Sequence, residues 1–277
     1  MQTAKHMLRT GRHGALHEFG MAYTDFKSSI QHPGLAWSLA WHDIVSRYRG
    51  SILGPFWITL SMGLMVLGMG FLYAEIFKVP IQEYMPFVAL GIVFWGVIVG
   101  VISEGCDTFV QASGMLSQTS LPMFTFVWRT VLRNLISLAH HLVIVVIVLI
   151  WFGLWKVANV PLALFGMVLV ILNVAWVSLA VGIASARFRD VPQIVGSIMQ
   201  FAMFMTPVFW QPARMGTMHA VLVFNPFFHM IDGIRAPLLG GQPGSGTYPV
   251  LIILAVLGWA GAFTAFTLTR RRIVHFL

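Results

Sequence analysis

The sequence predicts an all-α, polytopic membrane protein with six transmembrane helices, an N-terminal amphipathic interface helix and external re-entrant helices between spans five and six. Composition is the first reason. Of the 277 residues, 58% are hydrophobic and only 9% are charged, whereas about a quarter of the residues of a soluble domain are charged. The mean hydropathy is +0.82, and the single cysteine, Cys106, cannot form an intramolecular disulfide. Soluble enzymes, disordered chains and disulfide-rich secreted domains are therefore excluded.

Charge-free runs long enough to cross a bilayer are the second reason. A helix needs about 20 apolar residues to cross a hydrocarbon core about 30 Å thick. The run from 108 to 128 is long enough, but its Gln, Ser, Gly, Thr and Pro residues predict a loop with short helices. The six expected spans lie at about 52–73, 84–103, 132–154, 161–184, 192–210 and 249–269.

The distribution of positive charge is the third reason. With six spans both termini lie on one side of the membrane, and that side carries thirteen Lys and Arg residues against four on the other. The positive-inside rule predicts that both termini are cytoplasmic. The net charge of +8 is then mostly a topology signal, and no nucleic-acid partner is expected.

Residues 1–50 are predicted to form a cytoplasmic segment before the membrane domain of residues 51–277. No apolar run of the kind found in signal peptides precedes Gly50. Beyond Pro33, two Trp and one Tyr share an apolar stripe at helical spacing. This favours a helix in the membrane interface over an ordinary cytoplasmic helix packed on the rest of the protein. The stripe comprises Trp37, Trp41, Ile44, Val45 and Tyr48.

The segment 211–246, between spans five and six, is predicted to lie outside. Within it Met215 to Ile231 is as apolar as a span, but it is short and interrupted by Asn225 and Pro226. Backbone interrupted at membrane depth must be shielded by protein or face a cavity. Re-entrant helices that form a gate fit this pattern.

Motifs for chemistry are missing from the sequence. No Gly is followed by Lys, so the phosphate loop of ATPases is absent, and there is no zinc-ligand spacing and no G-x-S-x-G motif. We expect no catalytic residue, no metal site and no cofactor in this chain. No charged residue lies in the core of an expected span, which argues against ion-coupled transport.

Several sequence blocks resemble one family. Residues 41–57 contain the pattern R-Y-x-x-S-x-L-G-P-x-W, from Arg47 to Trp57. This is similar to the entry to the first span in permease subunits of polysaccharide-exporting ABC transporters. Further blocks resemble the same family in the same order: 121–133, 187–193, 206–210 and 225–241.

The resemblance implies a homodimer that assembles with two copies of an ATPase subunit, which would bind the ATP and Mg²⁺. It implies export of a glycan carried on undecaprenyl diphosphate across a bacterial inner membrane. The O-antigen branch is closer than the capsule branch, although a capsule or teichoic-acid exporter stays an alternative. In this family the interface helix and the loop after span two contact the ATPase, and the external re-entrant helices form the exit gate.

These expectations assign roles to particular residues. Arg47 and Arg49 are expected to bind the diphosphate of the lipid carrier, because Arg offers a bidentate fork to phosphate. The aromatic residues expected along the glycan path are Trp57, Tyr73, Phe201 and Phe204; the gate residues are Asn225, Pro226 and Arg235; and the residues that couple to the ATPase are Trp41, Asp43, Glu104 and Asp107.

Two other classes of function stay open on the sequence alone. A membrane enzyme acting on lipid-linked sugars would need acids or histidines grouped at one membrane face, and only Asp43, Arg47 and Arg49 come close. A passive channel would need no ATPase partner. Co-purification of an ATPase subunit separates both from an exporter.

Overall fold

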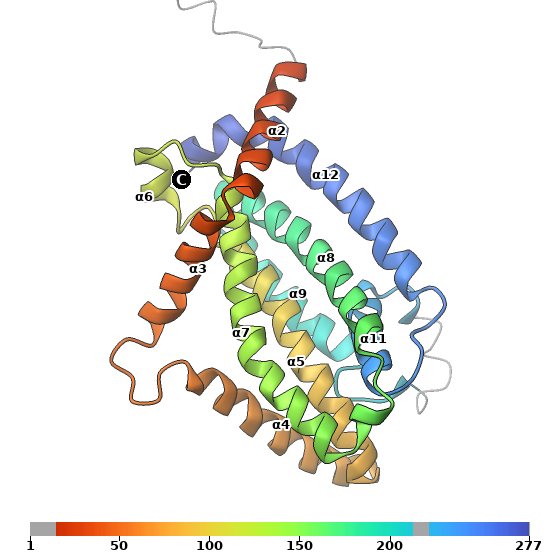
Figure 1. Ribbon diagram of the computed structural model, residues 1–277. Helices are drawn as coiled ribbons and strands as arrows, with labels where there is room; N and C mark the ends of the chain where they lie inside the picture. The colour runs from red at the N-terminus through yellow and green to blue at the C-terminus, as the bar shows by residue number, and fades with distance from the viewer. Residues whose placement is uncertain (1–14, 213–221, 277) are drawn as a thin grey trace, which may run out of the picture.

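The computed structural model describes residues 15–212 and 222–276, and every regular element in these ranges is a helix (Figure 1). The helices are α2 (Ala15–Gln31), α3 (Pro33–Arg47), α4 (Phe56–Phe77), α5 (Ile81–Cys106), α6 (Ser113–Gln118), α7 (Phe124–Trp151), the short 3₁₀ helix η2 (Leu154–Lys156), α8 (Val160–Arg187), α9 (Val191–Met205), α11 (Pro226–Leu238) and α12 (Thr247–Phe276). The predicted all-α class is confirmed.

Within the described residues, five helices are long and apolar enough to cross a membrane: α4, α5, α7, α8 and α12. The fifth expected span, at 192–210, differs, because α9 has only 15 residues, a length of about 22 Å at 1.5 Å per residue. It ends at Met205 because Pro207 constrains the preceding residue to extended backbone, and Thr206 adopts φ −97° and ψ 138°. The chain therefore leaves helical geometry before the end of the expected span.

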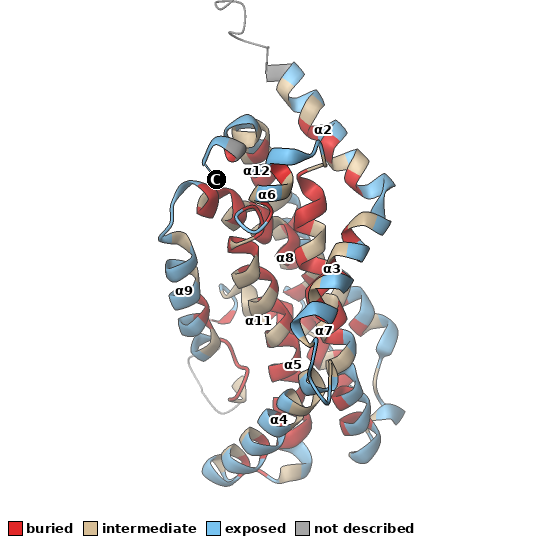
Figure 2. Ribbon diagram, turned by 90° about the vertical axis from the view of Figure 1, so that its left-hand side faces the viewer, coloured by how far each residue is buried: buried red, intermediate tan, exposed pale blue. Residues whose placement is uncertain are grey.

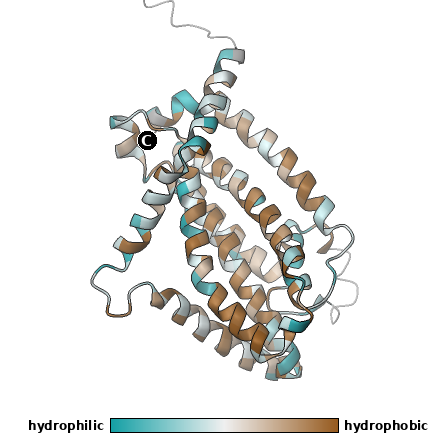
Figure 3. Ribbon diagram, in the orientation of Figure 1, coloured by the Kyte–Doolittle hydropathy of each residue, from teal (hydrophilic) through white to brown (hydrophobic). Residues whose placement is uncertain are grey.

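Helix α5 forms the centre of the bundle. In its most apolar stretch 83% of the residues are buried, against 11% in α4. Figure 2 shows α5 mostly buried, while α4 and α9 are largely exposed at the periphery. Hydrophobic residues concentrate along the central helices and hydrophilic ones toward α2 and α6 (Figure 3). The two peripheral helices thus present apolar faces that the rest of the described chain does not cover.

Helix α3 begins at Pro33, where proline is favoured in the first turn. Its predicted apolar stripe is divided between two faces. Ile44 is buried, packing with Ala40 against Ile136 of α7. Trp37 and Trp41 are about half exposed and stack at 6.4 Å between ring centroids. The helix therefore packs on the bundle along one face and keeps aromatic rings free on another.

Helix α2 was not predicted from the sequence. Phe26 lies within 6.5 Å, between ring centroids, of Phe124, Trp128, Trp259 and Phe263. This aromatic cluster joins α2 to α7 and α12.

The loop predicted at 108–128 contains the six-residue helix α6, as expected. Helix α7 begins at Phe124, eight residues before the expected span. In the segment 211–246 the structure describes α11 and the turn after it; residues 213–221, which include Arg214 and part of the Met215–Ile231 run, lie outside the described residues.

Candidate functional site

An ion-pair network joins α3, α5 and α7 at the end of the bundle that carries α2, α6 and the C-terminus (Figure 1). We call this the basic end. Asp43 of α3 is its centre. Arg129 donates from Nε and Nη2 to the two carboxylate oxygens at 2.7 and 2.6 Å, and Arg133 Nη1 donates to Oδ2 at 3.1 Å. The Asp43 and Arg129 side chains are 15% exposed and that of Arg133 8%. Such bidentate pairs are among the stronger charge-assisted hydrogen bonds.

Glu104, near the end of α5, extends this network. Its Oε2 accepts from Arg133 Nε at 2.9 Å and from Asn134 Nδ2 at 2.7 Å, and its Oε1 lies 3.5 Å from Arg47 Nη2. Gly100 allows the approach, because a Cβ there would collide with the Asn134 amide. Arg133 therefore bridges the carboxylates of α3 and α5 and ties three helices together.

The charge of Asp43 follows from these contacts. Burial alone would raise the pKa of its carboxyl group, but the hydrogen bonds and positive charges of Arg129 and Arg133 outweigh burial and hold the pKa below its usual value. Asp43 is therefore ionised at neutral pH and serves as a fixed anion between two guanidinium groups.

The other residues predicted at this end are separated from one another. Arg47 faces Glu104, whereas Arg49 lines a hollow of 360 Å³ together with His42, Ser46 and Pro55. Trp41 is half exposed and stacks on Trp37. Asp107 is the C-terminal cap residue of α5 and has no ion pair in the described part of the chain.

At the opposite end of the bundle, side chains hold the backbone just beyond α9. The carbonyl oxygens of Met205 and Pro207 accept from Asn225 Nδ2 at 3.2 Å and from Arg235 Nη1 at 2.7 Å. The Phe209 carbonyl accepts from the Tyr84 hydroxyl. We call this set the carbonyl clamp. Residues 206–209 are buried, so their backbone groups need protein partners, and the clamp supplies donors to alternate carbonyls.

Arg235 is the cation of the clamp. Arg235 is 4% exposed, and its guanidinium carbon lies 3.9 Å from the centroid of the Phe87 ring. This is a cation–π arrangement. Gly91, one turn beyond Phe87, lets residues 206–209 approach α5, because a Cβ there would collide with the Val208 carbonyl. Asn225 also caps α11, where its Oδ1 accepts from the Phe227 N–H at 2.9 Å, and Pro226 occupies the first helical position.

The aromatic residues predicted along a path differ in exposure. Trp57 on α4 is 44% exposed, and Phe201 and Phe204 on α9 are 66% and 59% exposed. Tyr73 instead stacks on Phe209 at 5.9 Å and supports the carbonyl clamp. The exposed rings belong to α4 and α9, the least buried of the helices expected to cross the membrane.

Most of the chain matches one protein family. Residues 34–239 match the model of the ABC-2 type transporter family. The chain belongs to this family. The resemblance drawn from the sequence blocks is thus confirmed, and the match spans both the ion-pair network and the carbonyl clamp. Helices α2 and α12 lie beyond it.

Two curated proteins are similar to this ABC-2 family member. The O-antigen export system permease protein RfbA of Myxococcus xanthus is 24% identical over 211 residues, covering 74% of this chain and 80% of that protein. The protein of the same name from Klebsiella pneumoniae is 21% identical over 226 residues, covering 78% and 86%. Membership of the family implies a transport subunit in a membrane, with an ATPase as its partner.

Sequence reasoning missed several residues of both sites. Arg129 and Arg133 are expected from the sequence only as part of the cytoplasmic positive charge and of the family-like block 121–133, and no role is expected for Asn134 and Tyr84. Two arginines spaced by four at the start of a helix are a local sign of a shared anionic partner, but which acid they meet is set by the fold.

Proposed function

We propose that this chain is the membrane subunit of an ATP-driven exporter that moves O-antigen polysaccharide, linked to undecaprenyl diphosphate, across the bacterial inner membrane. The observation that carries the proposal is the ABC-2 match over residues 34–239, together with two relatives named as O-antigen export permeases that cover about three quarters of the chain. The working unit is a homodimer with two ATPase subunits, which bind ATP and Mg²⁺.

The proposed topology has six crossings and cytoplasmic termini. The fifth crossing is α9, whose 15 helical residues span about 22 Å, continued by the non-helical residues 206–210. Helix α11 enters from outside without crossing. This is supported by the positive charge at the basic end and by the position of α2 and the C-terminus at that same end (Figure 1).

The glycan path is proposed to run along the exposed faces of α4 and α9. Trp57, Phe201 and Phe204 offer rings on which the apolar faces of sugars can stack without fixed hydrogen bonds, so that a polymer can slide. Cysteines at these three positions should crosslink to a nascent glycan, whereas a cysteine at the exposed Leu257 of α12 should react only with lipid probes. Reaction of all four positions with lipid probes alone would remove the path from these helices.

Arg47 and Arg49 are proposed to guide the lipid diphosphate. Their different surroundings indicate which of the two contributes more. Glu104 already lies 3.5 Å from Arg47, while Arg49 lines the hollow beside His42. We therefore expect Arg49→Ala to reduce export more than Arg47→Ala, and Arg49→Lys to restore part of it. Wild-type export by the double variant at normal abundance would rule out this role.

The coupling surface is proposed to comprise α6, Trp41 on α3 and the acids Glu104 and Asp107. Deletion of residues 111–118 should uncouple ATP hydrolysis from export. Asp107→Lys is the cleaner charge reversal, because reversal at Glu104 would also break the ion-pair network. If the ATPase still associates and export persists after the deletion, the loop is only a connector.

Depletion of this chain in its own cells tests the whole proposal. An exporter predicts that lipid-linked O-antigen accumulates at the cytoplasmic face while surface O-antigen disappears, and that an ATPase co-purifies with the chain. Accumulation of capsular or teichoic-acid precursors would instead support that alternative. Conversion of a lipid-linked sugar by the purified chain alone would contradict the exporter and support a membrane enzyme.

A further inference from the structure

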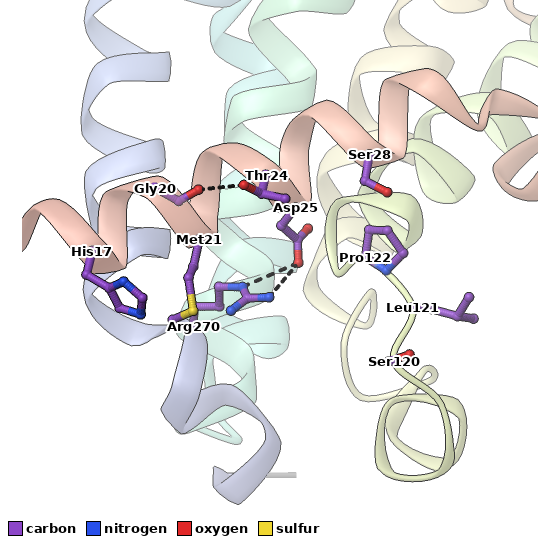
Figure 4. Close-up of a pocket in the computed structure, with 10 residues that line it drawn as sticks. All are labelled: His17, Gly20, Met21, Thr24, Asp25, Ser28, Ser120, Leu121, Pro122 and Arg270. Carbon is purple, nitrogen blue, oxygen red and sulfur yellow. Dashed lines mark hydrogen bonds and ion pairs between the residues drawn. The ribbon is translucent and has the colours of Figure 1, made fainter. Parts of the chain in front are cut away.

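Asp25 of α2 is a buried carboxylate that binds two distant parts of the chain. It is 5% exposed. Its Oδ2 and Oδ1 accept from the backbone N–H groups of Met123 and Phe124, both at 3.1 Å. Its Oδ2 also accepts from Arg270 of α12, at 3.3 Å from Nε and 3.2 Å from Nη2. Figure 4 shows Asp25 pointing from α2 toward Arg270.

The start of α7 depends on this contact for its hydrogen bonds. The first donors of a helix have no partner within it, and the residue at the N-terminal cap, Met123, carries no side-chain acceptor. The N–H groups of Thr125 and Phe126 bond to the carbonyls of Pro122 and Met123 at 3.0 and 3.1 Å. Asp25 serves the remaining two donors, and its negative charge is favourable at a helix N-terminus.

The N–H groups that Asp25 binds lie at the joint between α6 and α7. Residues 119–123 connect the two helices, and a hollow of 650 Å³ lies beside this joint, lined by Thr24, Ser28, Ser120 and Pro122 among others (Figure 4). The hollow leaves the joint space on one side. Asp25 is thus a point where the joint is attached to the bundle, and the attachment includes α12 through Arg270.

We propose that Asp25 is a positioning residue that transmits movement of α6 to α7 and α12 during transport. The inference rests on the proposed function, in which α6 contacts the ATPase. A displacement of α6 pulls on residues 119–123. Asp25 binds the N–H group of Met123, the last residue of this segment, and the N–H group of Phe124, the first residue of α7. Because one carboxylate also binds Arg270, helices α2, α7 and α12 follow together.

The chain offers a matched control for this idea. Glu18, also on α2, pairs with Arg271 of α12 at 2.9 Å. Glu18→Gln therefore removes an ion pair between the same two helices without touching the start of α7. Asp25→Ala removes both the cap and the pair, and Asp25→Asn keeps a neutral acceptor of the same size.

The experiment uses the complex with its ATPase in phosphatidylethanolamine–phosphatidylglycerol vesicles loaded with the cell's own lipid-linked glycan. It measures glycan moved per ATP hydrolysed, and amide exchange of residues 119–128. For Asp25→Ala we expect roughly tenfold faster exchange and at least about fivefold less glycan per ATP, with the ATPase still bound. Asp25→Asn should be intermediate and Glu18→Gln should match wild type.

The possible results distinguish a failure of the Asp25 proposal from a failure of the proposed function. If the wild-type complex exports but Asp25→Ala and Asp25→Asn keep its ratio of glycan to ATP, the inference is wrong and Asp25 is only structural. An equal loss in Glu18→Gln would also overturn it, since the effect would then belong to the contact between α2 and α12. If Asp25→Ala does not fold, Asp25→Asn decides alone. A wild-type complex that hydrolyses ATP without moving glycan overturns the proposed function itself.

Discussion

The two ends of the bundle use arginine in different ways. At the basic end, Arg129 and Arg133 bind carboxylates on neighbouring helices. In the carbonyl clamp, Arg235 binds a backbone carbonyl and the face of a ring. The nearest acid in sequence, Asp232, accepts instead from Gly244 and Thr247.

This difference reflects the backbone at each end. At the basic end the helices are regular, so side chains are free to bond to one another. Residues 206–209 are irregular and buried, so their carbonyls need donors from elsewhere. The first arrangement depends on opposite charges and the second on unsatisfied backbone, and the two should therefore respond differently to loss of a cation and to pH.

Removal of a cation at the basic end should have the largest effect. Arg133→Met leaves Asp43 with one guanidinium and takes the only buried cation from Glu104 among the described contacts. We expect a loss of about 3–5 kcal/mol in the free energy of unfolding, measured by denaturation in detergent. Arg271→Met, which breaks the more exposed pair with Glu18, should cost less than about 1 kcal/mol. Equal losses of stability in Arg133→Met and Arg271→Met would show that the ion-pair network contributes no more than the exposed pair.

Acid should weaken the basic end and spare the clamp. The pKa of Asp43 in the folded chain lies below its usual value because Arg129 and Arg133 stabilise the carboxylate. Its pairing therefore contributes fully above the unfolded value of about 3.9 and is lost as pH falls through the lower folded value. Between pH 6 and 3, Asp43→Asn should lose less stability than wild type. Parallel pH curves for the two proteins would contradict this.

The sequence predicted the long helices well, because hydrocarbon imposes a length and a composition that can be read locally. It overestimated α9, where a single feature, Pro207, ends the helix within an apolar run. It also missed α2, whose stability comes from an aromatic cluster with α7 and α12 and whose polar face gives no membrane signal. Hydropathy predicts which segments can lie in lipid, whereas the end of α9 is set by its proline, and the packing of α2 on α7 and α12 is not visible in the local pattern of α2.

The candidate sites were predicted only in part for a similar reason. Asp43, Glu104 and Arg47 do come together, and so do Asn225 and Arg235, although their roles in transport stay predictions. Tyr84 and its acceptor are 125 residues apart, and Asp25 and Arg270 are 245 apart. No local spacing encodes such contacts, so only the fold reveals them.

Removal of the cation from the clamp should cost less than at the basic end, because no opposite charge is left behind. Arg235→Met leaves the Pro207 carbonyl without its donor and removes the cation–π contact with Phe87. The substitution also removes the cost of burying the charge of Arg235, which offsets part of the loss. We expect a loss of about 2 kcal/mol. A double-mutant cycle with Phe87→Leu should give a coupling energy of about 1–2 kcal/mol, and a coupling near zero would mean that ring and guanidinium act separately.

The smallest effect should come from separating the two roles of Asn225. Its Oδ1 accepts from the Phe227 N–H and caps α11, while its Nδ2 donates to the Met205 carbonyl and to Thr206. Asn225→Asp keeps the cap, which an anion also serves well at a helix N-terminus, but replaces the donor with a second acceptor that faces a carbonyl. Asn225→Ala removes both. If the clamp matters, Asn225→Asp should still lose about 1 kcal/mol, and the loss should grow with pH as the new carboxyl ionises opposite Met205. If Asn225→Asp is as stable as wild type at neutral pH, Asn225 is a helix cap only, and Arg235 and Tyr84 alone hold the end of α9.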